Sequence, residues 1–497
     1  MSPLLILGCI AAYFAMLLII AWYTSRDAGS AGYYLGNKAS PWYIVAFGLI
    51  GDSLSGVTFI SVPGAVGVTK FSYLQVVLGY MIGYVVIGAV LLPLYYRMNL
   101  TSIYGYLRER FGPTSQKTGA VFFLLSRLLG AAARLYLAAG VVQTFVFDAW
   151  HIPFWLSVLG IIALILLYTY RGGIKTLVWT DTFQSTFLLL GVLLSIAVMM
   201  NQLHLGPRDL LSTLQASPNT KTFFFEDWHG ADYFWKQFLS GVFIAVVMTG
   251  LDQNSMQKNL SCPNLKDAQK NLYWFGLVVV VVNAFFLCLG ALLHAYAGAK
   301  GIPIPEHTDQ LFPMLALQHL GGFAAVVFII GLTAATFSSA DSVLTTLTTS
   351  FCIDVVDLPS SVGLDTPRGV VWRHATHVAF ALLLLGVILA FRAFNSPAVI
   401  VLVLKLATYT YGPLLGLFGL GLLSRRRPLD AWVPAACVVS PIVCWVLESH
   451  SREWFGGYQF GFELLMVNGA ITALLLLPFS TPVSVTSPSA AADPASR

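Results

Sequence analysis

Charged residues are scarce in this sequence. Lysine, arginine, aspartate and glutamate make up 10% of its 497 residues, whereas they make up about a quarter of a typical soluble domain. Hydrophobic residues reach 57%, and the mean hydropathy is +0.77. A composition so poor in charge predicts a chain that crosses a lipid bilayer many times. We therefore expect a multi-pass protein of the cell membrane, which in a Gram-negative bacterium is the inner membrane.

Two further absences narrow the function. The positive residues are scattered singly between apolar runs, so the net charge of +5 indicates no nucleic-acid-binding surface. The six cysteines lie in or beside apolar runs, without the spacing of a zinc site or of a disulfide framework. We expect neither a nucleic-acid partner nor an enzyme.

Long apolar stretches make up most of the sequence. Each is long enough to cross a hydrocarbon core, which takes about 20 helical residues. With the N-terminus outside, most lysines and arginines, including Lys258, fall in inner loops, as the positive-inside rule requires. The odd number of helices then places the C-terminus inside. The thirteen predicted spans are residues 3–24, 41–67, 72–98, 117–147, 152–170, 174–200, 232–252, 272–298, 318–350, 369–394, 397–423, 429–449 and 460–479.

The spans predict an all-α fold built from two five-helix units. Because five is odd, the two units must lie inverted relative to each other. In chain order we expect an extra N-terminal helix at 1–24, the first repeat at 41–200, an outer loop at 201–231, the second repeat at 232–423, two C-terminal helices at 429–480 and a disordered tail at 481–497.

The stretch 46–69 is apolar, yet glycine, proline and hydroxyl residues interrupt it. Such an interruption is tolerable in lipid only where it is buried in protein or lines a polar cavity. We interpret it as a broken helix at a binding site, the alternative being a continuous helix whose small residues allow close packing. The first helix of the second unit is interrupted at 248–253, and paired breaks in inverted repeats point to a midplane binding site.

A second polar stretch lies in the predicted span 318–350. Its oxygen-bearing residues 338, 341, 342 and 345 recur at helical spacing, so they share one face. Hard cations such as Na⁺ bind hydroxyl, carboxylate and carbonyl oxygens. An intramembrane carboxylate is costly unless it is paired or solvated, which makes Asp341 a functional candidate. The alternative is a structural hydrogen bond between helices.

Five segments of the chain form an ordered set of motifs: GLIGDSLSGVTFISVPG, RGGIKTLVWTDTFQ, LDQNSMQKNL, AATFSSADS and YGPLLGLFGLGLL. In this order and at these separations they resemble the sodium:solute symporter family, over residues 25–425. The resemblance implies a leucine-transporter-type inverted-repeat fold. It also implies secondary transport, in which Na⁺ moving down its gradient drives a small solute inward by alternating access.

The resemblance further implies residues that bind sodium and solute. The solute pocket of such carriers lies beside a shared sodium ion, in the broken helix. The implied ligands of this first ion are the backbone carbonyls of Gly51, Leu54 and Ala335 and the hydroxyls of Ser338 and Ser339. The implied solute contacts are Ser53, Ser55, Thr58 and, on the next helix, Gln75.

Some family members have an additional sodium site. It is formed by the aspartate of the Trp-Thr-Asp motif and by hydroxyls one turn along from Ser338. The corresponding positions here are Asp181, Asp341 and Ser342, with a carboxylate at 341 in place of a hydroxyl. Two carboxylates beside one cation would strengthen the site. We therefore predict two Na⁺ per solute.

Two arginines lie in the otherwise apolar span 117–147. Arg127 and Arg134 are two helical turns apart, so they project from the same face. Each needs a carboxylate, carbonyls or water at such depth. The family's sialate carriers use an arginine of this helix for the substrate carboxylate, and we predict this role for Arg134, with Arg127 serving a gate. The alternative for Arg134 is a structural pair with an acid such as Asp341.

The expected partners are therefore a small, polar, carboxylate-bearing solute, sodium ions and the lipid bilayer, and we expect a functional monomer. Two rival functions remain: a symporter for a neutral sugar or amino acid, and a transporter-like sensor that works with a separate signalling partner. Lys405 lies in the predicted span 397–423, where we expect it to form a structural pair or to extend to the interface.

Overall fold

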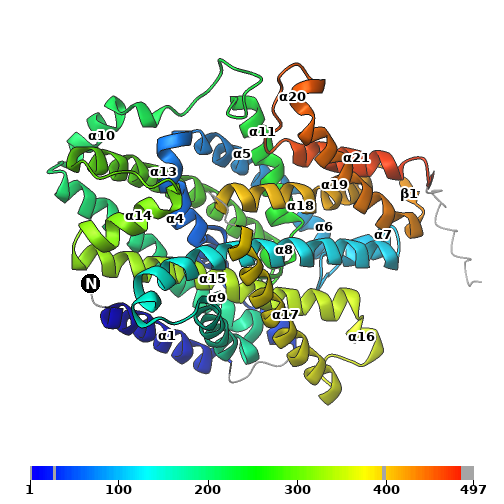
Figure 1. The fold of residues 1–497 in the computed structure, drawn as a ribbon. Coiled ribbons are helices and arrows are strands. Elements are labelled where there is room, and N and C mark those ends of the chain that lie inside the picture. Colours follow the sequence, from blue (N-terminus) through cyan, green and yellow to red (C-terminus); the bar gives the residue numbers. More distant parts are fainter. Residues whose placement is uncertain (1–2, 26–29, 395–398, 483–497) are drawn as a thin grey trace, which may run out of the picture.

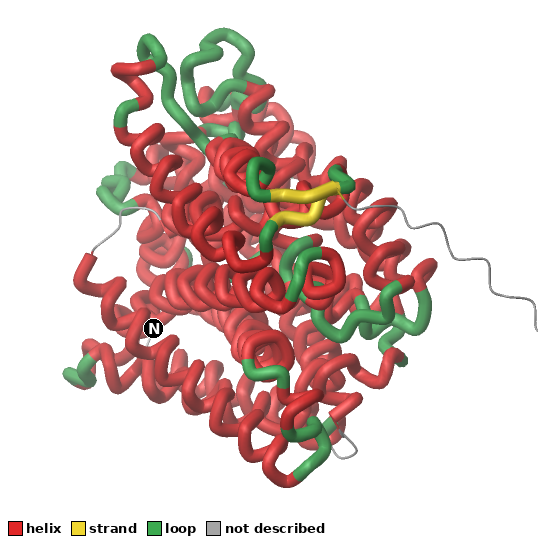
Figure 2. Tube along the Cα trace, turned by 90° about the vertical axis from the view of Figure 1, so that its right-hand side faces the viewer, coloured by secondary structure: helices red, strands yellow, loops and turns green. Residues whose placement is uncertain are grey.

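The computed structural model describes residues 3–25, 30–394 and 399–482. Figures 1 and 2 show these residues as a bundle of helices with a short two-stranded sheet at one end. The strands β1 (Arg426–Pro428) and β2 (Ser480–Pro482) pair antiparallel. Two residues of the predicted tail 481–497 thus belong to β2, and the rest of that tail lies outside the described residues.

The helices follow one another with few long connections. In the first part of the chain they are α1 Pro3–Thr24, α2 Ser30–Leu35, α3 Trp42–Ser53, α4 Gly56–Thr69, α5 Tyr73–Val86, α6 Leu92–Arg97, α7 Gly105–Arg110, α8 Pro113–Val142 and α9 Phe154–Gln202. They continue as α10 Pro207–Ala216, α11 Phe234–Ala245, α12 Gln253–Asn259, α13 Leu265–Lys300, α14 Leu311–Met314, α15 Gly322–Ser350, α16 Leu358–Ser361, α17 Pro367–Phe394, α18 Val399–Leu423, α19 Val433–Ser449, α20 Ser451–Trp454 and α21 Leu464–Leu476.

The lengths and composition of these helices agree with a mostly helical protein that crosses the membrane many times. Among the described residues, nine helices are long and apolar enough to span a bilayer, or up to eleven if each bent pair is one span. Two shorter apolar segments, Phe154–Thr169 and Leu464–Leu476, coincide with two more of the predicted spans.

Two helices are broken where the sequence analysis predicted breaks. α3 and α4 are bent by 55° at Leu54 and Ser55, whose ψ angles of 76° and 177° are not helical. α11 continues as a π turn over Val246–Gly250 and is bent by 67° from α12. Asp252 lies in this second break and caps α12, because its side chain accepts a hydrogen bond from the Ser255 N–H at 3.2 Å.

The predicted spans 152–170 and 174–200 lie in one continuous run of helix, α9, rather than in two helices separated by a loop. Gly173 interrupts this run with φ 53° and ψ −147°. A Cβ atom at Gly173 would lie 2.5 Å from the backbone oxygen of Tyr33, so a glycine is needed for this close approach. The turn between the two spans is therefore made by the kink itself.

α15 lies at the centre of the bundle, among α8, α9 and α17 (Figure 1). Every residue of α15 from 331 to 350 is buried, including its serines, threonines and Asp341. A helix rich in hydroxyl groups is stable in a membrane when its polar face meets protein rather than lipid. The polar face of α15 accordingly meets α3 and α9, next to the first break.

Candidate functional site

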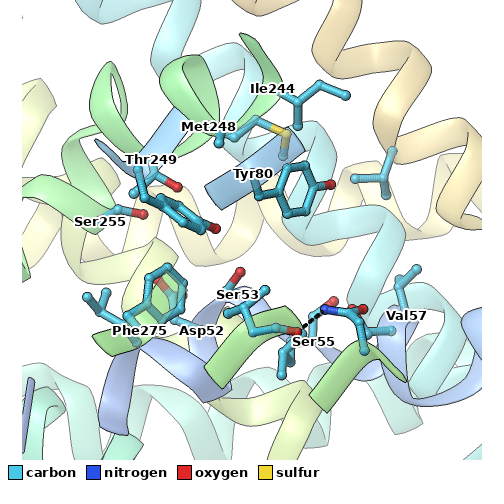
Figure 3. A pocket seen from close by; sticks show the side chains of 18 of the residues that line it. Asp52, Ser53, Ser55, Val57, Tyr80, Ile244, Met248, Thr249, Ser255 and Phe275 are labelled. Carbon is cyan, nitrogen blue, oxygen red and sulfur yellow. Dashed lines mark hydrogen bonds between the residues drawn. The ribbon is translucent and has the colours of Figure 1, made fainter. Parts of the chain in front are cut away.

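A cavity of about 90 Å³ lies between the two broken helices. One wall is the break between α3 and α4. The other is the π turn Val246–Gly250, which follows α11. Side chains of α5, α8 and α13, with single residues of α12 and α18, complete the lining. Figure 3 shows the two walls facing each other, with Asp52, Ser53 and Ser55 on one side and Tyr80, Met248 and Thr249 on the other.

Four of the five predicted solute contacts line this cavity: Ser53, Ser55, Thr58 and Arg134. Gln75 does not. Its amide is fully buried and bonds to backbone groups of the outer segment, donating to the Asp232 carbonyl at 3.0 Å and accepting from the Phe224 N–H at 3.1 Å. Gln75 therefore fastens α5 to the segment before α11.

The two arginines of α8 have different surroundings. Arg127 forms a buried ion pair with Asp252, with Nε 2.5 Å from Oδ2, and its Nη2 donates to the Met248 carbonyl at 3.3 Å. Arg134 lines the same cavity but forms no hydrogen bond or ion pair with any described residue. The alternative pair with Asp341 is absent from the described structure, where Asp341 instead accepts a hydrogen bond from the Tyr168 hydroxyl at 2.8 Å.

The implied ligands of the first sodium ion lie where α15 approaches the first break. A Cβ atom at Gly51 would lie 2.6 Å from the Ser185 Oγ and 3.0 Å from the Ser338 Oγ, so a larger residue would force these hydroxyls to shift. The hydroxyl of Ser339 is 3.3 Å from the Ala335 carbonyl. Because α3 ends at Ser53, the last carbonyls of this helix lack partners within it.

The chemistry of these groups fits a small hard cation. Carbonyl and hydroxyl oxygens are ligands that such ions accept. Among the described residues, no three His, Cys, Asp or Glu side chains converge in the way that a transition-metal site requires. The oxygens of the carbonyl and hydroxyl groups are the donors that hard cations prefer, whereas zinc and iron sites use nitrogen and sulfur ligands.

The predicted second sodium site has a different composition from the expected one. Asp181 and Ser342 do lie together, since the Ser342 hydroxyl donates to the Asp181 Oδ2 at 3.3 Å. Between them lies a group that sequence reasoning missed, the ammonium of Lys258, at 2.6 Å from the Asp181 Oδ2 and 2.8 Å from the Ser342 Oγ. Asp341 is directed elsewhere, toward Tyr168 and its neighbouring backbone N–H.

Lys258 is completely buried, which corrects its assignment to an inner loop. It belongs to α12, and its ammonium is also 3.5 Å from the Asp52 Oδ2. Asn254, one turn earlier on the same helix face, donates to that oxygen at 2.7 Å. The spacing of Asn254 and Lys258 at i and i+4 is the one sequence signal that could have indicated a shared buried partner.

A tyrosine-rich layer closes one end of the cavity. The hydroxyls of Tyr73 and Tyr80 are 3.5 Å apart, and Tyr73 also lines a larger cavity of about 500 Å³, here called the vestibule. The vestibule lies between α4, α5, α18 and the connections before α11 and α21. Lys405 lines it and pairs with Glu448 at 2.7 Å, which is the first of the two arrangements expected for this lysine.

Hydrogen bonds from other parts of the chain hold the second break in place. Besides Arg127, the hydroxyl of Tyr411 donates to Asp252. The hydroxyl of Tyr104 donates to the Leu251 carbonyl at 3.0 Å, and that of Tyr95 to the Gly250 carbonyl at 2.9 Å. The bonds of Tyr104 and Tyr95 use backbone carbonyls that the break removes from helical pairing.

Comparison with known proteins places this geometry in a family. A sodium/sialic acid symporter of Aliivibrio fischeri is 25% identical over 483 residues, covering 93% of this chain and 91% of that protein. A sodium-coupled monocarboxylate transporter of Mus musculus is 26% identical over 409 residues, covering 80% of this chain and 64% of that protein. Both relatives are sodium-coupled transporters by name.

Solved structures support the fold. A substrate-bound, outward-open Na⁺-coupled sialic acid symporter superposes with a TM-score of 0.81 at 20% sequence identity, over 96% of this chain and 98% of that one. The model of the sodium:solute symporter family matches residues 33–427. The chain therefore belongs to the sodium:solute symporter family and is a multi-pass membrane protein that couples solute uptake to Na⁺.

Proposed function

We propose that the cavity between the broken helices binds a small organic solute through a carboxylate, and that Na⁺ drives the uptake of this solute by alternating access. The observation that carries the proposal is the position of Arg134, which lines the cavity and forms no hydrogen bond or ion pair with the described residues. A guanidinium at membrane depth is costly unless an anion, carbonyls or water compensate it. A carboxylate ligand matches its two-armed geometry.

Other residues of the lining support a solute that also carries hydroxyl, amide or amine groups. Asp52 has one carboxylate oxygen, Oδ1, that is buried without a hydrogen-bond partner. A buried acceptor of this kind is satisfied by a donor from a bound molecule. Ser53, Ser55 and Thr249 add hydroxyl groups on the two walls. The names of the relatives, sialic acid and monocarboxylate transporters, agree with a solute that is an organic acid.

For the coupling ion, we propose the carbonyls and hydroxyls at the approach of α15 to the first break. These are Gly51, Leu54, Ala335, Ser338 and Ser339. Sodium bound there would fix the backbone of the break, and the same few residues present Ser53 and Ser55 to the cavity. An ion that organises the solute site raises solute affinity, and by linkage the solute raises ion affinity.

The proposed topology has thirteen membrane-spanning helices in the division into two repeats given above, and the protein acts as a monomer. In Figure 1, α1 begins at the end of the bundle marked N, whereas β1 lies at the other end, which agrees with an odd number of crossings. With the N-terminus outside, the vestibule opens outward. The tyrosine layer is then the outer gate, and the bonds of Arg127, Tyr104 and Tyr411 are the inner one.

Uptake into proteoliposomes tests this function. The probes are radiolabelled N-acetylneuraminate, lactate, glucose and proline, each offered with an inward Na⁺ gradient and with an equal K⁺ gradient. We expect an organic acid to accumulate above its external concentration with Na⁺ and not with K⁺. Uptake that never exceeds the external concentration would indicate a channel or a sensor. Accumulation of a neutral probe alone would overturn the carboxylate assignment.

A further inference from the structure

We propose that the ammonium of Lys258 permanently takes the place of a second coupling ion, so that this transporter moves one Na⁺ per solute. The inference rests on the proposed function, because it concerns the stoichiometry of the same cycle. It replaces the prediction of two Na⁺ made from the sequence, in which Asp181, Asp341 and Ser342 formed an ion site.

The geometry around the ammonium resembles that around a bound cation. Oxygens from three different elements surround the Nζ: Asp181 of α9 at 2.6 Å, Ser342 of α15 at 2.8 Å and Asp52 of α3 at 3.5 Å. An ammonium has three N–H donors, which matches three oxygen partners. Asp181 and Ser342 lie within hydrogen-bond distance of the ammonium, and Asp52 forms a longer ion pair with it.

A second Na⁺ would have to displace this group. Its two best ligands, the Asp181 Oδ2 and the Ser342 Oγ, are already hydrogen-bonded to the Nζ. A second cation at the same oxygens would lie in direct contact with the ammonium, where repulsion is strong because the cluster is buried. The third expected ligand, Asp341, is held away by Tyr168.

Lys258 differs from an ordinary structural ion-pair residue, because its partner Asp181 also contacts a proposed sodium ligand. Asp181 uses its other oxygen, Oδ1, to accept a hydrogen bond from the Ser338 hydroxyl at 3.1 Å. Ser338 is a proposed ligand of the first ion. Asp181 therefore contacts Lys258 directly and is linked to that ion through the Ser338 hydroxyl. A tethered cation balances Asp181 in every state of the cycle, but it never leaves the protein, and it therefore carries no net charge across the membrane.

Equilibrium binding of ²²Na⁺ to the purified full-length protein in detergent, without solute, tests the inference. We expect one Na⁺ per wild-type chain with a Hill coefficient of about one. Lys258→Ala frees Asp181 and Ser342 and leaves space beside them, so it should bind two Na⁺. The double variant Asp181→Asn with Lys258→Met removes both charges together and should return to one. Lys405→Ala, which breaks a lysine–carboxylate pair in the vestibule, is the matched control and should bind one.

Several outcomes would overturn the inference. Two Na⁺ per wild-type chain would do so directly, whether or not the Lys258→Ala protein folds. A folded Lys258→Ala protein that binds one Na⁺, or a double variant that binds two, would do so as well. Wild-type protein that binds no Na⁺ would overturn the proposed function and this inference with it, whereas two ions per chain would leave the proposed function intact.

Discussion

We expect the substitution Arg134→Lys to weaken solute binding without affecting folding. The change keeps the positive charge but loses the planar fork that binds a carboxylate through two parallel hydrogen bonds. Arg134 forms no hydrogen bond or ion pair with the described residues, so the substitution removes no interaction that holds helices together. We therefore expect a variant that folds normally, binds Na⁺ normally and binds its solute weakly.

The size of the effect follows from the lost hydrogen bond. A hydrogen bond to a charged group contributes about 1.5–3 kcal/mol. Since about 1.4 kcal/mol corresponds to a factor of ten in affinity, losing one arm of the fork should weaken solute binding roughly 10- to 150-fold. Lysine also has a shorter reach than arginine, which adds to the loss if the ammonium fails to contact the carboxylate.

Isothermal titration calorimetry on purified protein measures this change. The titrant is whichever organic acid wild-type protein accumulates in proteoliposomes, at saturating NaCl. Arg208→Lys is the matched control, because Arg208 lies exposed on α10, and its solute affinity should equal that of wild type. Thermal unfolding should give the same midpoint for both variants. An Arg134→Lys protein with unchanged solute affinity would refute the assignment of Arg134 to the carboxylate.

Two further substitutions test other parts of the site. Ser338→Ala combined with Ser339→Ala removes both proposed hydroxyl ligands, so the Na⁺ concentration for half-maximal uptake should rise at least about tenfold; an unchanged Na⁺ dependence would exclude these serines as ligands. Gln75→Ala removes the bonds between α5 and the outer segment, so it should lower the midpoint of thermal unfolding while the solute affinity measured by calorimetry stays within about twofold of wild type. A large loss of affinity in a stably folded Gln75→Ala protein would return Gln75 to the list of solute contacts.

Local composition predicted the two breaks because they arise from local chemistry. Glycines and hydroxyl residues around Leu54 and Ser55 disfavour a continuous helix, and Asp252 caps the helix that follows it. The apolar lengths likewise predicted most spans, since a helix that crosses lipid needs a fixed number of apolar residues. Features of this kind depend on residues that are neighbours in the sequence.

The partners of the polar side chains were not predictable in the same way. Arg127 and Arg134 have the same local setting, and what distinguishes them is Asp252, which lies 125 residues from Arg127 along the chain. Asp341 is bonded to Tyr168, 173 residues away. Gln75 has partners in a distant outer segment. A polar residue in a membrane helix indicates that some partner must be present, but the sequence does not show which residue it is.

Lys258 was assigned to an inner loop, although it is buried in the protein. The positive-inside rule concerns lysines in loops that face the cytoplasm, and Lys258 lies close enough to a predicted span end to be assigned to such a loop. The second break extends this region into a short buried helix, α12, and so carries Lys258 into the protein. The break itself was predicted; that the chain after it remains inside the bundle depends on the packing of α12 against α3, α9 and α15.

The link through Asp181 has a consequence for ion affinity. A serine hydroxyl that binds Na⁺ offers its oxygen to the ion and still needs an acceptor for its proton. For Ser338 that acceptor is the Asp181 Oδ1 at 3.1 Å, while the Oδ2 of the same carboxylate bonds to Lys258. The lysine draws negative charge toward Oδ2, so it sets how strongly Oδ1 polarises the serine. If Ser338 binds Na⁺ as proposed, Lys258 tunes the affinity of an ion that it never touches, and its replacement changes both the number of ions bound and the strength with which the first is held.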